Sequence, residues 1–285
     1  MKKIDWSKVL IRSSCTGKIL ANGKGATLTE KQSAYIGELE SKTSLTANQQ
    51  TTLNELIAKR DAPPTLGDTC ISYLKEVYVW EKYGKEPVGG SARSKYTMKG
   101  LIVEDESIGM LDRIDKMDYK KNEEWFKNDY LSGTPDIIVR NEAGLPVKII
   151  DIKSSYDFST LLANDGSPLN PLYYAQMQSY MALTGATEAE VCYCLVNMPQ
   201  EQVEAEKRRL YYALNAATEE SPDYVREVER MENNFTFDEV PIHERVLRFP
   251  VQRDENFISK LYTRVTECRK WLQEYDNKRM SIYSK

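Results

Sequence analysis

Apolar residues recur at helical spacing through the first third of the chain, which predicts a helical N-terminal region over residues 1–94. Two capping-box patterns, Thr29-Glu-Lys-Gln32 and Thr46-Ala-Asn-Gln49, predict helices over about 29–42 and 46–60. Pro63-Pro64 is expected to end this pair, because proline disrupts a helix interior.

Three further features precede the middle of the chain. Asp68 is placed to cap a third helix, which Gly84 is expected to end. Gly89-Gly90-Ser91 predicts a loop, since glycine and serine interrupt regular structure. A fourth helix is expected from about Thr97 to Met117.

After residue 117 the spacing of apolar residues changes from helical to strand-like. Asp136–Arg140 and Pro146–Lys153 are two β-rich runs on either side of the turn Asn141-Glu-Ala-Gly144. Short strand-like runs around such a turn predict a β-hairpin.

Helices and strands alternate through the rest of the chain. A helix from about Pro171 to Thr184 is expected to stop at Gly185, and Val191–Val196 predicts a buried strand. The C-terminal region 201–285 adds a helix over Val203–Ala217, a strand over Arg245–Val251 and an amphipathic helix over Asp254–Lys278. The central order α-β-β-α-β predicts an α/β fold, in a single domain over 1–285 with its core at about 95–200.

Composition excludes several classes of protein. With 41% hydrophobic and 29% charged residues, the chain is typical of globular proteins and not of disordered ones. We find neither an apolar run of membrane-spanning length nor a signal peptide, and therefore expect a cytoplasmic protein without a membrane partner. The net charge of −4 argues against a protein that coats nucleic acid, although an enzyme with a local basic channel is compatible with it.

Cysteine and histidine usage limits the chemistry. The five cysteines include no CxxC pair, which argues against a disulfide framework and against zinc or iron-sulfur sites. The one histidine, His243, is more typical of a surface residue than of a ligand or a catalytic base. Carboxylates must therefore carry any metal chemistry.

The strongest candidate chemistry lies at Asp151-Ile-Lys153, at the end of the hairpin. Acid-x-Lys patterns also occur at Glu40-Ser-Lys42, Asp118-Tyr-Lys120 and Asp276-Asn-Lys278, in stretches that predict helix or loop. On a strand, Asp151 and Lys153 point to one face while Ile150 and Ile152 pack into the core. The hairpin also brings Asp136 beside Asp151, because the two residues are about equally far from the turn.

Two carboxylates and one carbonyl at this place suit a magnesium ion. Asp136, Asp151 and the backbone carbonyl of Ile152 would form an all-oxygen site of the kind that Mg²⁺ prefers. The metal would lower the pKa of a bound water, and Lys153 would orient that water or accept its proton. An ordinary Asp–Lys ion pair at a strand end is the alternative, and the hairpin alone favours it.

Two features outside the hairpin favour an active centre. Gln176 and Tyr180 lie four residues apart on the following helix, so both side chains can point toward the strand ends. On the helix before the hairpin, Glu104 provides an acid that completes the metal site or helps to hold a second ion. Glu106 is the alternative ligand.

These residues together resemble a known group of enzymes. Glu104, Gly133-x-x-Asp136, Asp151-x-Lys153 and Gln176-x-x-x-Tyr180 look like the ordered motifs of the PD-(D/E)xK nuclease superfamily. The helix Tyr174-Ala-Gln-Met-Gln-Ser-Tyr-Met-Ala-Leu-Thr-Gly185 is similar to that of YqaJ-type viral recombinases, which are relatives of phage lambda exonuclease. The resemblance covers about residues 98–197 and implies a restriction-endonuclease-like core, in which helices flank a central mixed β-sheet, with helical additions at both ends.

The resemblance also implies an activity and a set of roles. It implies a metal-dependent exonuclease that degrades one strand of linear duplex DNA from the 5′ end in phage-type recombination, in the cytoplasm of a bacterial host. Mg²⁺ would be the cofactor and Mn²⁺ a substitute, and no iron-sulfur cluster is expected because the four-cysteine pattern of some relatives is absent. Glu104, Asp136 and Asp151 would be metal ligands, Lys153 the catalytic lysine, and Gln176 and Tyr180 supports of the site.

Further expectations concern partners. By resemblance, Arg12 is a candidate to bind a terminal DNA phosphate, a trimeric ring is the expected oligomer, and a single-strand annealing protein is the expected partner. The segments 46–60 and 201–244 match nothing in the family. An endonuclease, a nuclease for single-stranded or branched DNA, and a non-catalytic DNA-end-binding protein therefore stay open as alternatives.

Overall fold

The computed structural model describes residues 3–21, 28–61, 65–86 and 94–283. The expected helix end at Pro63-Pro64 and the expected loop at Gly89-Gly90-Ser91 lie outside these ranges. The chain divides into two compact units, here called the helical unit (Met1–Ile11, Cys15–Glu86 and Ser259–Lys285) and the sheet unit (Arg12–Ser14 and Pro87–Ile258). That all 285 residues form one nuclease domain stays a prediction.

The helical unit contains short helices and the long C-terminal one. Its elements are η1 (Trp6–Lys8), α1 (Thr16–Ile19), α2 (Glu30–Glu40), α3 (Ala47–Asp61), α4 (Asp68–Tyr83) and, from Ser259 on, α11 (Glu255–Tyr283). Both predicted capping boxes form, Thr29 with Gln32 and Thr46 with Gln49. The expected cap at Asp68 is wrong. Gly67 is the N-cap of α4, and Asp68 is its first residue, where a negative charge favours the helix dipole.

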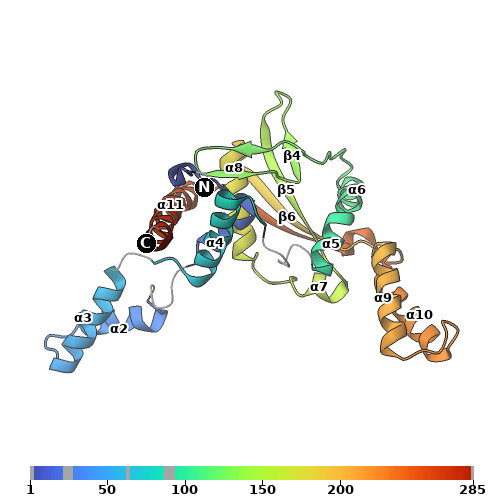
Figure 1. Cartoon of the computed structure of the whole chain (residues 1–285), viewed down its shortest axis with the longest axis horizontal. Coiled ribbons are helices and arrows are strands. Elements are labelled where there is room, and N and C mark those ends of the chain that lie inside the picture. Colours follow the sequence, from blue (N-terminus) through green and yellow to red (C-terminus); the bar gives the residue numbers. More distant parts are fainter. Residues whose placement is uncertain (1–2, 22–27, 62–64, 87–93, 284–285) are drawn as a thin grey trace. The chain divides into compact units, whose positions relative to one another are not determined.

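The sheet unit is built on a four-stranded mixed sheet with the order β4-β5-β6-β7 (Figure 1). The predicted hairpin is confirmed, since β4 and β5 pair antiparallel; β6 runs parallel to β5, and β7 antiparallel to β6. The strands are β4 (Ile137–Arg140), β5 (Pro146–Ser154), β6 (Glu188–Cys194) and β7 (Val246–Gln252). The predicted mixed α/β architecture is therefore confirmed.

Two helices cover opposite faces of this sheet, α6 (Glu104–Asp115) and α8 (Pro171–Thr184) (Figure 1). Ile150 and Ile152 of β5 pack in one apolar cluster with Leu111 of α6. Ile149 packs in another with Met177 of α8. Because side chains alternate along a strand, the side chains of Asp151 and Lys153 face α8.

The region before the hairpin differs from its prediction. The single helix expected over Thr97–Met117 is two helices, α5 (Lys95–Ile102) and α6, because the backbone leaves the helical conformation at Val103 (φ −99°, ψ 10°). Three acidic residues follow in the first turn of α6, where they favour a new helix N-terminus. Glu104 is thus the first residue of a helix.

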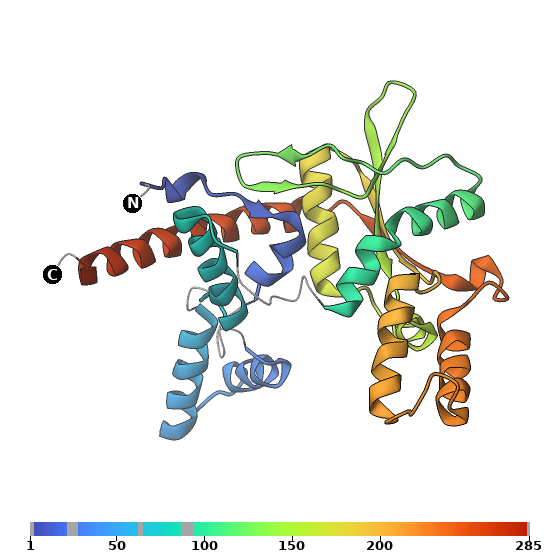
Figure 2. The ribbon, with the colours of Figure 1, turned by 45° about the vertical axis from the view of Figure 1, so that its right-hand side comes forward.

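The remaining elements of the sheet unit are short strands and peripheral helices. Strands β2 (Phe126–Lys127) and β3 (Leu131–Gly133) pair antiparallel, in a second sheet that also takes in Arg12 at the end of β1 (Ile11–Arg12). The others are η2 (Ser13–Cys15), α7 (Phe158–Leu162), α9 (Gln200–Ala213), α10 (Pro222–Phe235) and η4 (Ile242–Arg245). Helices α9 and α10 lie side by side (Figure 2), and α10 was not predicted. Within the described residues, no helix combines the length and apolarity needed to cross a bilayer.

A buried lysine joins the ends of two central strands to α5. Lys99 is fully buried, and its ammonium group donates hydrogen bonds to the backbone oxygens of Ser155 (2.8 Å), Tyr156 (3.0 Å) and Val196 (2.9 Å). Burial lowers the pKa of Lys99 to about 8. The three acceptors lie just beyond the ends of β5 and β6, so this one side chain fixes both.

We expect Lys99→Met to lower the free energy of unfolding by about 2 kcal/mol, because three buried carbonyl groups lose their donor while the aliphatic volume is kept. Urea denaturation of the purified protein measures this change. Lys95→Met is the matched control, since Lys95 is exposed and pairs with Glu206 at 3.3 Å; its expected effect is within about 0.5 kcal/mol. Equal losses in the two variants would contradict the proposed role of Lys99.

Candidate active site

The register of β4 and β5 brings two carboxylates together at one end of the hairpin. Ile137 pairs with Ile150, so Asp136, one residue before β4, lies opposite Asp151. Asp136 Oδ2 accepts a 2.7 Å hydrogen bond from the backbone N–H of Ile152. The convergence of the two aspartates that the sequence predicted is present in the structure.

Asp151 is a buried carboxylate, 1% exposed, with a positive group beside it. Lys153 Nζ lies 2.6 Å from Asp151 Oδ2, and Gln176 Nε2 donates to Asp151 Oδ1 at 3.0 Å. Lys153 Nζ also lies 4.7 Å from the centre of the Tyr173 ring, so both the ion pair and an aromatic face confine it.

Gln176 and Tyr180 of α8 connect Asp151 to the loop before β4. Gln176 Nε2 donates to the hydroxyl of Tyr180 at 3.2 Å, and that hydroxyl donates to the backbone oxygen of Thr134 at 3.1 Å. The shared helix face that their spacing predicted is confirmed. A continuous set of hydrogen bonds thus runs from Asp151 to the backbone two residues before Asp136.

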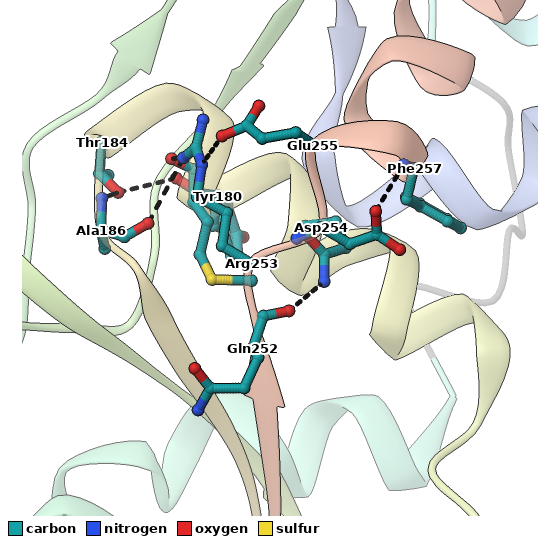
Figure 3. Close-up of polar contacts among 10 residues, drawn as sticks. Tyr180, Thr184, Ala186, Gln252, Arg253, Asp254, Glu255 and Phe257 are labelled. Atoms are coloured by element: carbon teal, nitrogen blue, oxygen red, sulfur yellow. Dashed lines mark hydrogen bonds and ion pairs between the residues drawn. The ribbon is translucent and has the colours of Figure 1, made fainter.

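The side chain of Gln178 attaches the other face of α8 to the end of β7. Its amide donates to the backbone oxygen of Gln252 at 2.7 Å and accepts from the backbone N–H of Asp254 at 2.9 Å, in the region that Figure 3 shows. This pair of bonds imitates a β-ladder, so it specifies the position of α8 along the sheet.

Arg253 holds the C-terminal end of the same helix (Figure 3). Its guanidinium donates to the backbone oxygens of Met181 and Ala186. A cation at this end of a helix also interacts favourably with the helix dipole. Gln178 and Arg253 therefore fix the position of α8 relative to the strands, and with it the position of Gln176.

Gly133 permits the close packing of the loop before β4. A Cβ atom there would lie 2.7 Å from Ser13 Oγ and 2.8 Å from Tyr180 Cε1, distances that real Cβ atoms do not reach. A larger residue would displace Tyr180, so the glycine of the Gly133-x-x-Asp136 motif serves packing.

Burial and neighbouring charge shift the pKa values of Asp136 and Lys153. Burial, assisted by the adjacent charge of Asp151, raises the pKa of Asp136 to about 8. For Lys153, burial lowers the pKa, but the nearby Asp151 and Asp136 carboxylates outweigh that effect and the net shift is upward. The neighbouring carboxylates therefore favour the ammonium form of Lys153 in this arrangement.

Glu104 lies beside the hairpin, and its carboxylate is engaged by another lysine. Glu104 Oε1 is 3.3 Å from Lys121 Nζ. The charge of Glu104 contributes to the raised pKa of Asp136, whereas Glu106 is exposed and its charge acts on Lys99. The influence of its charge on Asp136 favours Glu104 over Glu106 as the third acid.

Arg12 is exposed and close enough to influence the site. Burial raises the pKa of Tyr180, and the positive charge of Arg12 is among the effects that oppose this shift. An exposed guanidinium at this place is accessible to an anion, as the expectation of a phosphate contact requires.

The donor set suits a hard divalent cation in part. Within the ranges that the structure describes, no three side chains of His, Cys, Asp or Glu stand close enough to enclose a metal ion. Asp136 and Asp151 nevertheless lie near enough for the charge of Asp151 to raise the pKa of Asp136, and Asp151 Oδ2 is buried without a hydrogen bond besides its ion pair. A divalent cation would favour the ionised form of both carboxylates.

Sequence reasoning missed a segment that borders Asp136. The Cα of Lys121 pairs with that of Ile137 in an isolated antiparallel bridge. Asn122 donates from its backbone N–H to the oxygen of Asp136 at 2.7 Å and from Nδ2 to the oxygen of Pro135 at 2.9 Å. The segment has no apolar periodicity, so its sequence carries no local indication of this edge pairing.

Comparison with known proteins bears on the fold. No family model matches the chain, and no curated protein matches it. A phage related exonuclease from Haemophilus somnus 129PT superposes with a TM-score of 0.61 at 20% identity, covering 95% of this chain and 97% of that one. The alkaline exonuclease LHK-Exo from Laribacter hongkongensis gives a TM-score of 0.53 at 13% identity, with 98% of each chain covered. This chain therefore has the fold of the phage-related and alkaline exonucleases, as the resemblance implied.

The pKa of Asp136 predicts a pH-dependent stability. Because the folded state holds this proton more tightly than the unfolded state, the stabilisation is complete below about pH 4 and is lost as pH rises through about 8. With EDTA present, wild type should lose stability relative to Asp136→Asn between pH 5 and pH 8. Urea denaturation of both proteins across that range measures the difference, and a constant difference would contradict the assigned shift.

Proposed function

We propose that the chain is a Mg²⁺-dependent DNA exonuclease that hydrolyses phosphodiester bonds of linear duplex DNA. The observation that carries the proposal is the convergence of Asp136, Asp151 and Lys153 on one face of the sheet, supported from α8 by Gln176 and Tyr180. The shared fold with a phage-related and an alkaline exonuclease supports the same activity.

The proposed roles follow from the chemistry of each group. Asp136, Asp151, Glu104 and the carbonyl of Ile152 would hold the cation, which lowers the pKa of water and offsets charge on the phosphate when bound. The Lys153 ammonium, kept protonated by Asp151, would orient water and stabilise negative charge that develops on the phosphate. Gln176 and Tyr180 would keep the Asp151 carboxylate in position.

The finer features of the activity come from the family resemblance. We infer degradation from the 5′ end in phage-type recombination, a terminal-phosphate contact at Arg12, a trimeric assembly and a single-strand annealing partner. Digestion of end-labelled duplexes with a 5′ phosphate at one end and a 5′ hydroxyl at the other tests the polarity and the end preference.

Asp151→Asn and Lys153→Met should each lower the rate of digestion of linear duplex DNA in Mg²⁺ by at least about a hundredfold, because the first removes a proposed metal ligand and the second removes the ammonium group proposed to act on the reacting phosphate. Release of labelled nucleotides measures the rate. Asp118→Asn and Lys120→Met alter another Asp-x-Lys pattern, an exposed ion pair at 2.6 Å, and should digest DNA at the wild-type rate. Undiminished activity in either site variant would refute the assignment.

An exonuclease requires a DNA end, so a closed circular plasmid should resist the protein while the same plasmid, once linearised, is degraded. Gel analysis of both forms in Mg²⁺ and in EDTA provides the measurement. Equal loss of both forms would contradict the exonuclease activity and indicate an endonuclease of the same fold. Binding of DNA without hydrolysis in either Mg²⁺ or Mn²⁺ would instead indicate a non-catalytic end-binding protein.

A further inference from the structure

Lys121 lies in the segment that pairs with the start of β4, and its side chain contacts Glu104. Its Nζ lies 3.3 Å from Glu104 Oε1 and 3.6 Å from Asp105 Oδ1. The backbone places it there, because Lys121 pairs with Ile137 and the next residue, Asn122, bonds to the backbone of Asp136. The lysine is thus held by the same strand edge that carries the candidate active site.

We propose that Lys121 is an exchangeable counter-ion of the active site: its ammonium group neutralises Glu104 until a divalent cation enters, and then binds a phosphate of the DNA. The proposal rests on the proposed function, since it concerns the cation and the substrate of the same site. It adds a substrate-binding residue that belongs to none of the sequence motifs named above.

The contrast between two lysine–acid pairs supports the exchange. The side chains of Lys153 and Asp151 are 23% and 1% exposed, whereas those of Lys121 and Glu104 are 42% and 20% exposed. Water and salt screen the more exposed pair, so a doubly charged ion can displace its lysine.

The first test measures cation binding without DNA. Mn²⁺ is titrated into each protein at pH 7.5, and free Mn²⁺ is followed by electron paramagnetic resonance. We expect Lys121→Met to bind Mn²⁺ about three- to tenfold more tightly than wild type, because a competing positive charge is removed. Lys121→Arg keeps the charge and should not gain affinity. Lys120→Met is the matched control, since it removes the neighbouring lysine, whose partner is Asp118, and should leave the affinity unchanged.

The second test measures the DNA contact. In the Lys153→Met background with Mg²⁺, adding Lys121→Met should weaken binding to a labelled duplex and reduce the slope of log affinity against log salt concentration by about 0.9, the value for one phosphate contact. Adding Lys120→Met instead should leave the slope unchanged. Fluorescence anisotropy at several salt concentrations gives both quantities, and thermal melts verify that each variant is folded.

The outcomes separate this inference from the function on which it rests. Equal Mn²⁺ affinity in Lys121→Met and Lys120→Met, or an unchanged salt slope, would overturn the role of Lys121 while leaving the nuclease intact. Wild-type protein that shows no Mn²⁺ binding sensitive to Asp136→Asn would overturn the proposed metal site, and this inference with it.

Discussion

The buried charge of Asp151 is the constraint on which the rest of the site depends. A carboxylate removed from water on a central strand is costly unless opposite charge and hydrogen bonds compensate for the lost hydration. Lys153 supplies the charge from the same strand, and Gln176 supplies a hydrogen bond from α8. Because both compensating groups must arrive at the same carboxylate, the strand and the helix have little freedom to move independently.

The features that fix α8 follow from that requirement. Gln178 binds the main chain at the end of β7, and Arg253 binds a carbonyl oxygen at the end of the helix. These contacts fix the position of α8 relative to the sheet from the side away from Asp151. On the side toward Asp151, Gly133 lets the Tyr180 ring approach the loop before β4. Polar contacts with no catalytic role therefore control the precision of the site, as expected where a site is built on rigid elements.

The parts of the fold that sequence predicted correctly are those with strong local determinants. The hairpin follows from two β-rich runs around one turn, and α8 has Pro171 at its start and Gly185, with φ of 82°, at its end. The alternation of side chains along β5 then sufficed to place Asp151 and Lys153 together. These inferences needed no information from distant residues.

The errors have a common physical origin in non-local structure. The break at Val103 and the helix α10 lie in stretches where helical residues are common and the boundaries depend on packing. Lys121 is near the site because its backbone pairs with Ile137, which is not a neighbour in sequence. The segment around Lys121 has no apolar periodicity that would predict this pairing. The motif residues of the candidate site could be predicted from the sequence. The contacts that position them, on α8 and at the edge of β4, could not.

Burial differentiates the two lysine–acid pairs, which have the same charges. The Lys153–Asp151 pair is shielded by α8 and by the Tyr173 ring, so dissolving it would leave a carboxylate in a medium where charge is poorly solvated. The Lys121–Glu104 pair is reached by water, which can solvate either partner when the other leaves. The Lys121–Glu104 pair is therefore the easier of the two to separate, because it is the more exposed pair.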